Sequence, residues 1–296
     1  MSKTIKSIKW THLNIPTHEE KLILSTMKEM QNDYNFFDSK HITKLENKLK
    51  KICPKRPWLT PFHAFSMRRS HLRDNLITRH RHVLAKKEHI KELYDKNIDI
   101  TDIARRYNYS PVATFRILLQ ARGITSKVKL SNITKFPDKH LGKYDQQQLQ
   151  LAIDNDIISM PDHSPIIEAA EGFEVDLEAY LKSKFPNAPY KTQPDMVKEQ
   201  TETMGRAIAT PDIYFPKGIK INGRKIFWID AKNFYGANIS NIRGGLKKQV
   251  KRYNQLYGPG AVIFKYSYSI GLKHQFIMNH TNPDQRALLL SWDGKV

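Results

Sequence analysis

A pair of β-prone runs on either side of Asn222-Gly223 constrains the fold more than any other feature of the chain. Three β-prone residues follow Asp212, and the run Lys225–Asp230 holds Ile, Phe, Trp and Ile before its acidic end. Asn-Gly between two such runs is the strongest short signal for a tight antiparallel turn. The sequence therefore predicts a β-hairpin whose open end carries two carboxylates, those of Asp212 and Asp230.

The charged residues at the end of this hairpin suit the binding of a hard divalent cation. Lys232 lies two residues beyond Asp230 and therefore on the same face of its strand. Mg²⁺ or Mn²⁺ takes carboxylate oxygens, and the bound cation polarises a phosphodiester and lowers the pKa of water. A neighbouring ammonium orients that water or stabilises developing charge. This is the chemistry of a phosphodiesterase, and a purely structural ion pair between Asp230 and Lys232 is the alternative.

The residues around Asp230 strengthen the prediction of a cation site. Between Ile213 and Pro283 the chain has twelve Lys and Arg residues and one acid, Asp230, at the end of an apolar run. A lone carboxylate in a half-buried setting needs a partner. Either Lys232 or a cation supplies one.

Composition bounds the class of protein. A chain of 296 residues with 40% hydrophobic residues is long enough for two domains with their own cores. The formal net charge of +20 indicates a polyanionic partner, and the basic segments lack the aromatic face that a membrane surface requires. A single cysteine, Cys53, excludes an internal disulfide and a cysteine-rich zinc site. With no membrane-length apolar run and no signal-peptide core, we expect a soluble intracellular protein.

The N-terminal part of the chain reads as a series of basic helices. Between Ser66 and Lys87, seven Arg and Lys residues accompany one acid, and patchy apolar spacing predicts a helix with one buried face. This helix presents either a phosphate-contacting surface or a merely solvated charged face.

Three further helices are marked by their end signals. Asn97 is a left-handed stop for the first, and Thr101 is an N-cap for the second. Ser110 with Pro111 begins the third, which ends at Gly123. Short helices joined by such a tight turn are typical of a helix-turn-helix, and a plain three-helix bundle is the alternative.

A helix-turn-helix places its last helix in the major groove of DNA. The outward side chains of that helix are then expected to be Ala113, Thr114, Arg116 and Gln120. The expected phosphate contacts are Arg105, Arg106 and Lys127.

The distribution of turn-forming and helix-ending residues along the chain predicts its domains. We expect a basic helical domain with the helix-turn-helix over 1–124, a connector over 125–160, and a second domain over 161–296. Apolar residues at helical spacing between Ile166 and Leu181 predict a helix near the start of the second domain.

Thr210-Pro211-Asp212 followed by Asp230-Ala231-Lys232 resembles the PD-(D/E)xK nuclease superfamily, and in particular its TPD-motif family, which includes the codanin-interacting nuclease of animals. The resemblance covers most of the chain, including the segments IARRYNYSP, GFEV, WIDAK and QVKRYNQLYGPGAVIF. It implies an α+β fold, with an all-α N-terminal region containing the helix-turn-helix and a C-terminal mixed-sheet, restriction-endonuclease-like domain. Strands are then expected near 211–216, 224–231 and 261–269, with a turn at Gly258 to Gly260 before the last.

The resemblance also implies roles for individual residues. Asp212, Asp230, Glu174 of the GFEV segment and the Ala231 carbonyl are expected to bind Mg²⁺ or Mn²⁺, with Lys232 beside the nucleophile. Gln249 and Tyr253 match a Q-x-x-x-Y element that positions the site or the nucleic acid in related nucleases. The basic residues of the same predicted helix are expected to contact the nucleic-acid backbone: Arg243, Lys247, Lys248, Lys251 and Arg252.

The expected function is therefore a metal-dependent nuclease that acts on nucleic acid, with DNA as the favoured substrate and the nucleus as the favoured location. Two alternatives stay open. One is an adaptor that binds nucleic acid without turnover, and the other is a scaffold that mainly binds a codanin-like partner protein. Strandedness, the mode of cleavage and the oligomeric state do not follow from the sequence.

Overall fold

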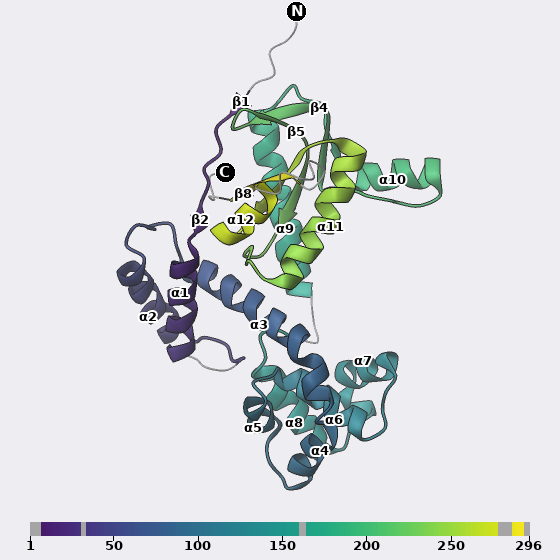
Figure 1. Cartoon of the computed structure of the whole chain (residues 1–296). Helices are drawn as coiled ribbons and strands as arrows, with labels where there is room; N and C mark the ends of the chain where they lie inside the picture. The colour runs from purple at the N-terminus through teal and green to yellow at the C-terminus, as the bar shows by residue number, and fades with distance from the viewer. Residues whose placement is uncertain (1–6, 31–33, 160–163, 278–285, 293–296) are drawn as a thin grey trace, which may run out of the picture. The chain divides into compact units, whose positions relative to one another are not determined.

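The computed structural model describes residues 7–30, 34–159, 164–277 and 286–292 (Figure 1). Within these residues the chain is α+β, with twelve α-helices and a mixed sheet, which confirms the predicted class at this level. It divides into an α/β unit, made of residues 1–21 and 164–296, and a helical unit, made of residues 22–163. None of the described helices has the length and apolar character needed to cross a bilayer.

The helical unit is built from α-helices of 7 to 24 residues, and the division between the units falls inside the first of them. These elements are α1 (Thr17–Met30), α2 (Ser39–Ile52), α3 (Pro61–Leu84), α4 (Lys87–Asp95), α5 (Ile100–Arg106), α6 (Pro111–Ala121), α7 (Lys127–Lys135), the 3-10 helix η1 (Pro137–Lys139) and α8 (Lys143–Asp154).

Local signals account for the ends of the helices around α5 and α6. Asn97 has a positive φ angle of 58° and ends a helix as predicted, and Asn108, with a φ of 45°, follows the end of the next helix. The Ser110 hydroxyl accepts a hydrogen bond from the Ala113 N–H at 3.1 Å, which caps α6 with Pro111 in its first turn. The second helix begins one residue before the predicted cap, because Asp99 is the N-cap of α5.

Helix α6 packs against α4, α5 and α8 and is buried on most of its surface. Thr114 is fully buried, and its hydroxyl donates to the Ser110 carbonyl at 2.8 Å. The prediction that Thr114 points outward is therefore wrong, because neighbours distant in sequence cover that face of the helix. The partly exposed positions of α6 include Ala113, Arg116 and Gln120, so the helix-turn-helix stays a prediction beside the plain helical bundle.

Residues 125–160 are not a connector. Helices α7 and α8 occupy most of this segment, and Leu130, Ile133, Leu149 and Ala152 belong to the buried core of the helical unit. The signals for these helices are weak in the sequence, because they supply few apolar residues each and become stable only by packing. The change of unit falls at 163/164, close to the predicted start of the second domain at 161.

The α/β unit carries a six-stranded mixed sheet in the order β1-β4-β5-β6-β8, with β3 paired to β4, and a separate pair of β2 with β7. Its strands are β1 (Ser7–Ile8), β2 (Asn14–Ile15), β3 (Lys191–Thr192), β4 (Ile213–Ile221), β5 (Arg224–Lys232), β6 (Gly260–Phe264), β7 (Tyr268–Ser269) and β8 (Ala287–Ser291). Its helices are α9 (Ser164–Lys184), α10 (Gln193–Met204), α11 (Ser240–Tyr257) and α12 (Ile270–Ile277).

The predicted hairpin is confirmed. Strands β4 and β5 are antiparallel, and Asn222 and Gly223 form the turn with φ angles of 50° and 76°. The register shifts between Tyr214 and Ile219, where β4 has extra residues. Strands β5, β6 and β8 then run parallel to one another.

Two buried cores cover the faces of this sheet, with α9 on one side and α11 on the other (Figure 1). Phe173, Leu177 and Leu181 of α9 join the first core, and Leu246 and Val250 of α11 join the second. The predicted helix over 166–181 and the turn before β6 are both confirmed. Because apolar side chains of these helices cover both faces of the sheet, Asp212 and Asp230 lie together at the open end of the β4–β5 hairpin.

The N-terminal residues belong to the α/β unit, which the sequence did not indicate. Strand β1 pairs with β4, and the Trp10 N–H donates to the Asn222 side chain at 2.7 Å. The Trp10 indole N–H also donates to the Ser291 carbonyl at 2.7 Å. Residues 7–10 therefore stabilise the hairpin turn, and Trp10 does so across 212 positions of the chain.

Candidate active site

Asp212 and Asp230 lie at the open end of the β4–β5 hairpin. The register pairs Ile213 with Ile229, so each aspartate stands one residue beyond this pair. One carboxylate oxygen of Asp212, Oδ2, accepts a hydrogen bond from the Ala231 N–H at 2.6 Å. The two carboxylates are therefore held at adjacent positions by neighbouring strands.

Asp230 is buried, with 2% of its surface exposed. Its Oδ1 accepts a hydrogen bond from Gln249 Nε2 at 2.9 Å, and its Oδ2 lies 2.5 Å from Lys232 Nζ. Among the residues that the structure describes, Oδ2 receives no conventional hydrogen bond beyond this ion pair. The two oxygens of this carboxylate therefore have different partners, an amide on Oδ1 and an ammonium on Oδ2.

The pKa values of both carboxyl groups are raised above the ordinary value. Burial raises the pKa of Asp212 to about 7, and the neighbouring charge of Asp230 adds to the effect. Burial also raises the pKa of Asp230, while Lys232 and the hydrogen bond from Gln249 oppose that rise. A cation beside both groups would favour their charged forms.

Glu174 of α9 lies within electrostatic reach of the aspartates. Its side chain is half-buried, and burial raises its pKa, with further contributions from the charges of Asp230 and Glu171. Lys232 acts in the opposite direction. In the described part of the chain, no group of three or more His, Cys, Asp or Glu side chains is gathered closely enough to hold a metal ion. The role of Glu174 as a third ligand stays a prediction, as does that of the Ala231 carbonyl.

Gln249 and Tyr253 of α11 connect the two strands that carry the aspartates. Besides its bond to Asp230, Gln249 Nε2 donates to the Tyr253 hydroxyl at 3.2 Å. That hydroxyl donates to the Thr210 carbonyl at 3.2 Å, two residues before Asp212. The Tyr253 ring packs edge-on against Trp228 at 5.1 Å between ring centres. Tyr253 is thus a core aromatic whose hydroxyl reaches the site.

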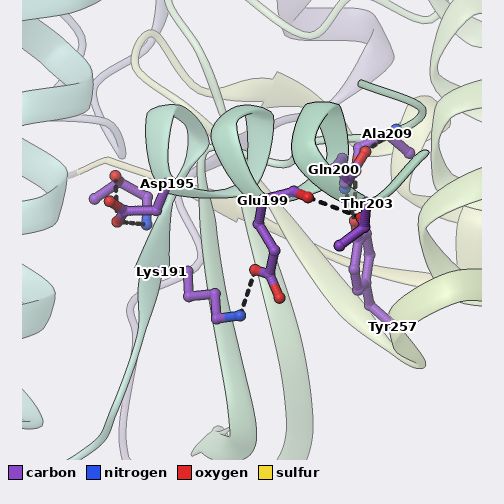
Figure 2. Close-up of polar contacts among 8 residues, drawn as sticks. Lys191, Asp195, Glu199, Gln200, Thr203, Ala209 and Tyr257 are labelled. Carbon is purple, nitrogen blue, oxygen red and sulfur yellow. Dashed lines mark hydrogen bonds and ion pairs between the residues drawn. The ribbon is translucent and has the colours of Figure 1, made fainter. Parts of the chain in front are cut away.

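Two further residues fix the approach to Asp212, and sequence reasoning missed both. Gln200 of α10 and Tyr257 of α11 bond to each other and to Ala209, as Figure 2 shows. Neither residue stands in a recognisable motif, so only the fold reveals them.

The basic residues predicted to contact nucleic acid fall in both units. Lys248 and Arg252 are exposed on α11, and Arg252 Nη1 donates to the Ile208 carbonyl at 3.3 Å. The helical unit contains Arg105, Arg106, Arg116 and Lys127. Arg105 and Arg106 are exposed, and Arg105 pairs with Asp102 at 2.6 Å.

Arg116 differs from these exposed cations. It is half-buried, its Nη2 donates to the Thr134 hydroxyl at 3.5 Å, and burial lowers the pKa of its guanidinium. This environment is less suited to a phosphate contact than that of Arg105 or Arg106. Its predicted role in nucleic-acid binding stays a prediction.

Comparison with known proteins supports the TPD family. Residues 142–282 match a family described as "Protein of unknown function TPD sequence-motif". An uncharacterized protein of Acanthamoeba polyphaga mimivirus is 28% identical over 201 residues, which cover 66% of this chain and 67% of the viral protein. No solved structure matches the chain. The matched family segment contains both aspartates, Lys232 and Gln249.

Proposed function

We propose that the α/β unit is a metal-dependent nuclease of the PD-(D/E)xK type, which hydrolyses phosphodiester bonds of nucleic acid. The observation that carries the proposal is the pair of carboxylates from neighbouring strands, the half-buried Asp212 and the buried Asp230, with the Lys232 ammonium beside Asp230. Two neighbouring carboxyl groups with raised pKa values suit a divalent cation, which favours their charged forms.

The donor set fits Mg²⁺ or Mn²⁺. Mg²⁺ commonly keeps several water ligands and is held by one or two carboxylates, so it does not need a third protein side chain. We assign Asp212, Asp230 Oδ2 and the Ala231 carbonyl as ligands, with Glu174 as a further ligand or as the holder of a bound water.

The residues of the chain have separate parts in the proposed reaction. The bound cation would polarise the phosphodiester and lower the pKa of a water. Lys232 would stabilise negative charge that develops on the attacked phosphate, because its ammonium is held at the site by Asp230. Gln249 orients Asp230 through Oδ1 and leaves Oδ2 directed to Lys232 and the cation.

The surface of α11 supports nucleic acid as the substrate. Lys248, Lys251 and Arg252 are exposed on the helix that also carries Gln249. Such cations bind the phosphate backbone without regard to sequence and with strong dependence on salt. DNA remains the favoured substrate and the nucleus the favoured location, with Arg105, Arg106 and Arg116 as further proposed contacts.

The proposal is tested by cleavage of labelled single-stranded, duplex and branched DNA and RNA with Mg²⁺ or Mn²⁺. Wild type and Asp230→Asn are compared, and Asp154→Asn serves as a control because Asp154 lies in the helical unit, where its partner is Gln150. We expect metal-dependent cleavage that Asp230→Asn reduces at least a thousandfold and that Asp154→Asn leaves unchanged.

Other outcomes would lead to different conclusions. Tight binding without cleavage by any of the proteins would contradict the nuclease for those substrates and favour the adaptor. Capture of a codanin-like protein by a protein that cleaves nothing would favour the scaffold. Cleavage that survives in Asp230→Asn would show that the site is assigned wrongly.

A further inference from the structure

The side-chain amide of Gln200 uses all of its hydrogen-bonding capacity on one short segment and one partner. Its Oε1 accepts from the N–H groups of Ile208 at 2.7 Å and Ala209 at 3.1 Å. Its Nε2 donates to the Ala209 carbonyl at 2.9 Å and to the Tyr257 hydroxyl at 2.8 Å (Figure 2). An amide offers two donors and two acceptor positions, so Gln200 is saturated in this one orientation.

The segment that Gln200 holds leads directly into the candidate site. Ala209 is buried and stands three residues before Asp212. Its carbonyl also accepts from the Tyr257 hydroxyl, and the following carbonyl, that of Thr210, accepts from Tyr253. The Asp212 carbonyl in turn accepts from the Gln193 N–H at 3.0 Å, at the start of α10. Helix α10 therefore bonds to the chain at Ile208 and Ala209, before the Thr210-Pro211 pair, and again at Asp212, after it.

Packing of α10 itself does not explain this arrangement. Of the twelve residues of α10, all of which the structure describes, Met196 alone is fully buried. The helix is stabilised at its start by a capping box, in which Asp195 accepts from the Thr192 N–H at 2.9 Å (Figure 2). Gln200 lies in the middle of α10, and its side chain serves the segment after the helix rather than the helix.

We infer that Gln200 is a positioning residue that sets the place of the Asp212 carboxylate through the backbone of Ile208 to Thr210. The inference rests on the proposed function for its catalytic meaning, but the positioning itself is a property of the free protein. Asp212 Oδ2 accepts from the Ala231 N–H, so this amide reports whether the carboxylate stays in place.

The experiment compares wild type with Gln200→Met, which keeps the length of the side chain and removes its hydrogen bonds. Thr203→Ala is the matched control on α10, because the Thr203 hydroxyl donates only to the Glu199 carbonyl of the same helix, at 2.8 Å (Figure 2). Hydrogen exchange of the Ala231 amide is measured by NMR on the metal-free full chain, with the amide of Val262 in β6 as the reference for global opening.

We expect Gln200→Met to speed exchange at Ala231 about tenfold relative to Val262, and Thr203→Ala to leave it unchanged. Equal acceleration at both amides would show that the substitution lowers overall stability. Unchanged exchange at Ala231 would show that the hydrogen bonds of Gln200 act only on the segment it contacts and not on Asp212. Either result would overturn the inference.

A second measurement separates the inference from the nuclease proposal. Affinity for Mn²⁺, measured by electron paramagnetic resonance on the free protein, should fall about tenfold in Gln200→Met and not in Thr203→Ala. If the wild-type protein binds no Mn²⁺ and cleaves nothing, the nuclease proposal fails. The exchange of Ala231 then still decides whether Gln200 positions Asp212.

Discussion

Each unit of the molecule buries an aspartate, and the two aspartates are satisfied in different ways. Asp156 of the helical unit is fully buried, and each of its carboxylate oxygens accepts two hydrogen bonds. Oδ2 bonds to the Ser110 hydroxyl and the Val112 N–H, and Oδ1 to the N–H groups of Ile158 and Ser159. Burial raises the pKa of this carboxyl, and the four hydrogen bonds oppose that rise and hold the start of α6 in place.

Asp230 of the α/β unit is as deeply buried but is less completely bonded. One oxygen accepts from Gln249, and the other has the Lys232 ammonium but no conventional hydrogen bond among the described residues. A second carboxylate, that of Asp212, stands beside it. Burial raises the pKa of Asp212, and the nearby charge of Asp230 adds to the rise. Burial alone therefore does not distinguish the two aspartates, whereas the ammonium and the second carboxylate beside Asp230 do.

The largest expected effect comes from replacing Asp156 with its neutral isostere. Asp156→Asn turns one acceptor of two hydrogen bonds into an amino group that faces their donors, among them buried backbone N–H groups. We expect the free energy of unfolding to fall by about 2–4 kcal/mol. Urea unfolding followed by circular dichroism measures the change.

The matched substitution in the other unit is Asp230→Asn. Because burial raises the pKa of Asp230, the neutral side chain relieves an unfavourable charge, and Gln249 keeps its acceptor. We expect a metal-free stability within about 1 kcal/mol of wild type at pH 8, or higher. Equal destabilisation by the two substitutions would erase the distinction between the two aspartates.

The second effect is a dependence of metal-free stability on pH that comes from Asp212. Its pKa rises from an ordinary value of 3.8 to about 7, so the folded protein binds this proton more tightly than the unfolded chain. The resulting stabilisation is complete below pH 4 and is lost as the pH rises through 7, with an upper limit on the order of 4 kcal/mol. Asp230, Glu174 and Lys232 are the charged groups that set this pKa.

This dependence is measured by calorimetric unfolding between pH 4.5 and 8, pH values chosen to span the titration. Asp212→Asn should show a smaller decline in stability over the range than wild type. Added Mg²⁺ should restore wild-type stability at pH 8, because a cation replaces the proton between the carboxylates. A wild-type decline identical to that of Asp212→Asn would contradict the assignment.

The smallest effect is expected at Tyr253. Tyr253→Phe keeps the ring against Trp228 and removes the hydroxyl that bonds to Thr210 and Gln249. We expect a loss of about 1 kcal/mol in unfolding free energy and a drop in cleavage rate of roughly threefold to tenfold. A rate equal to that of wild type would show that the hydroxyl has no part in holding the site.

Local signals in the sequence were sufficient for the elements that build the site. Asn222-Gly223 fixes the hairpin because both residues adopt positive φ, and this brings Asp212 and Asp230 to one end. Likewise Ser110 with Pro111 places the start of α6, and Gly258 ends α11 with a φ of 85°. Each signal acts within a few residues, so it is legible without the fold.

Contacts between distant segments were decided by the tertiary structure alone. The pairing of β1 with β4, the burial of Thr114 and the packing of α7 and α8 depend on residues far away in the chain, and no local pattern encodes them. The hydrogen bond from Gln200 to the Ala209 carbonyl belongs to the same class, because nothing in the sequence around an exposed glutamine indicates which group its side chain will contact. Composition and motif place the two acids together, but only the folded chain determines which donors each carboxylate oxygen receives, because that depends on every group packed around it.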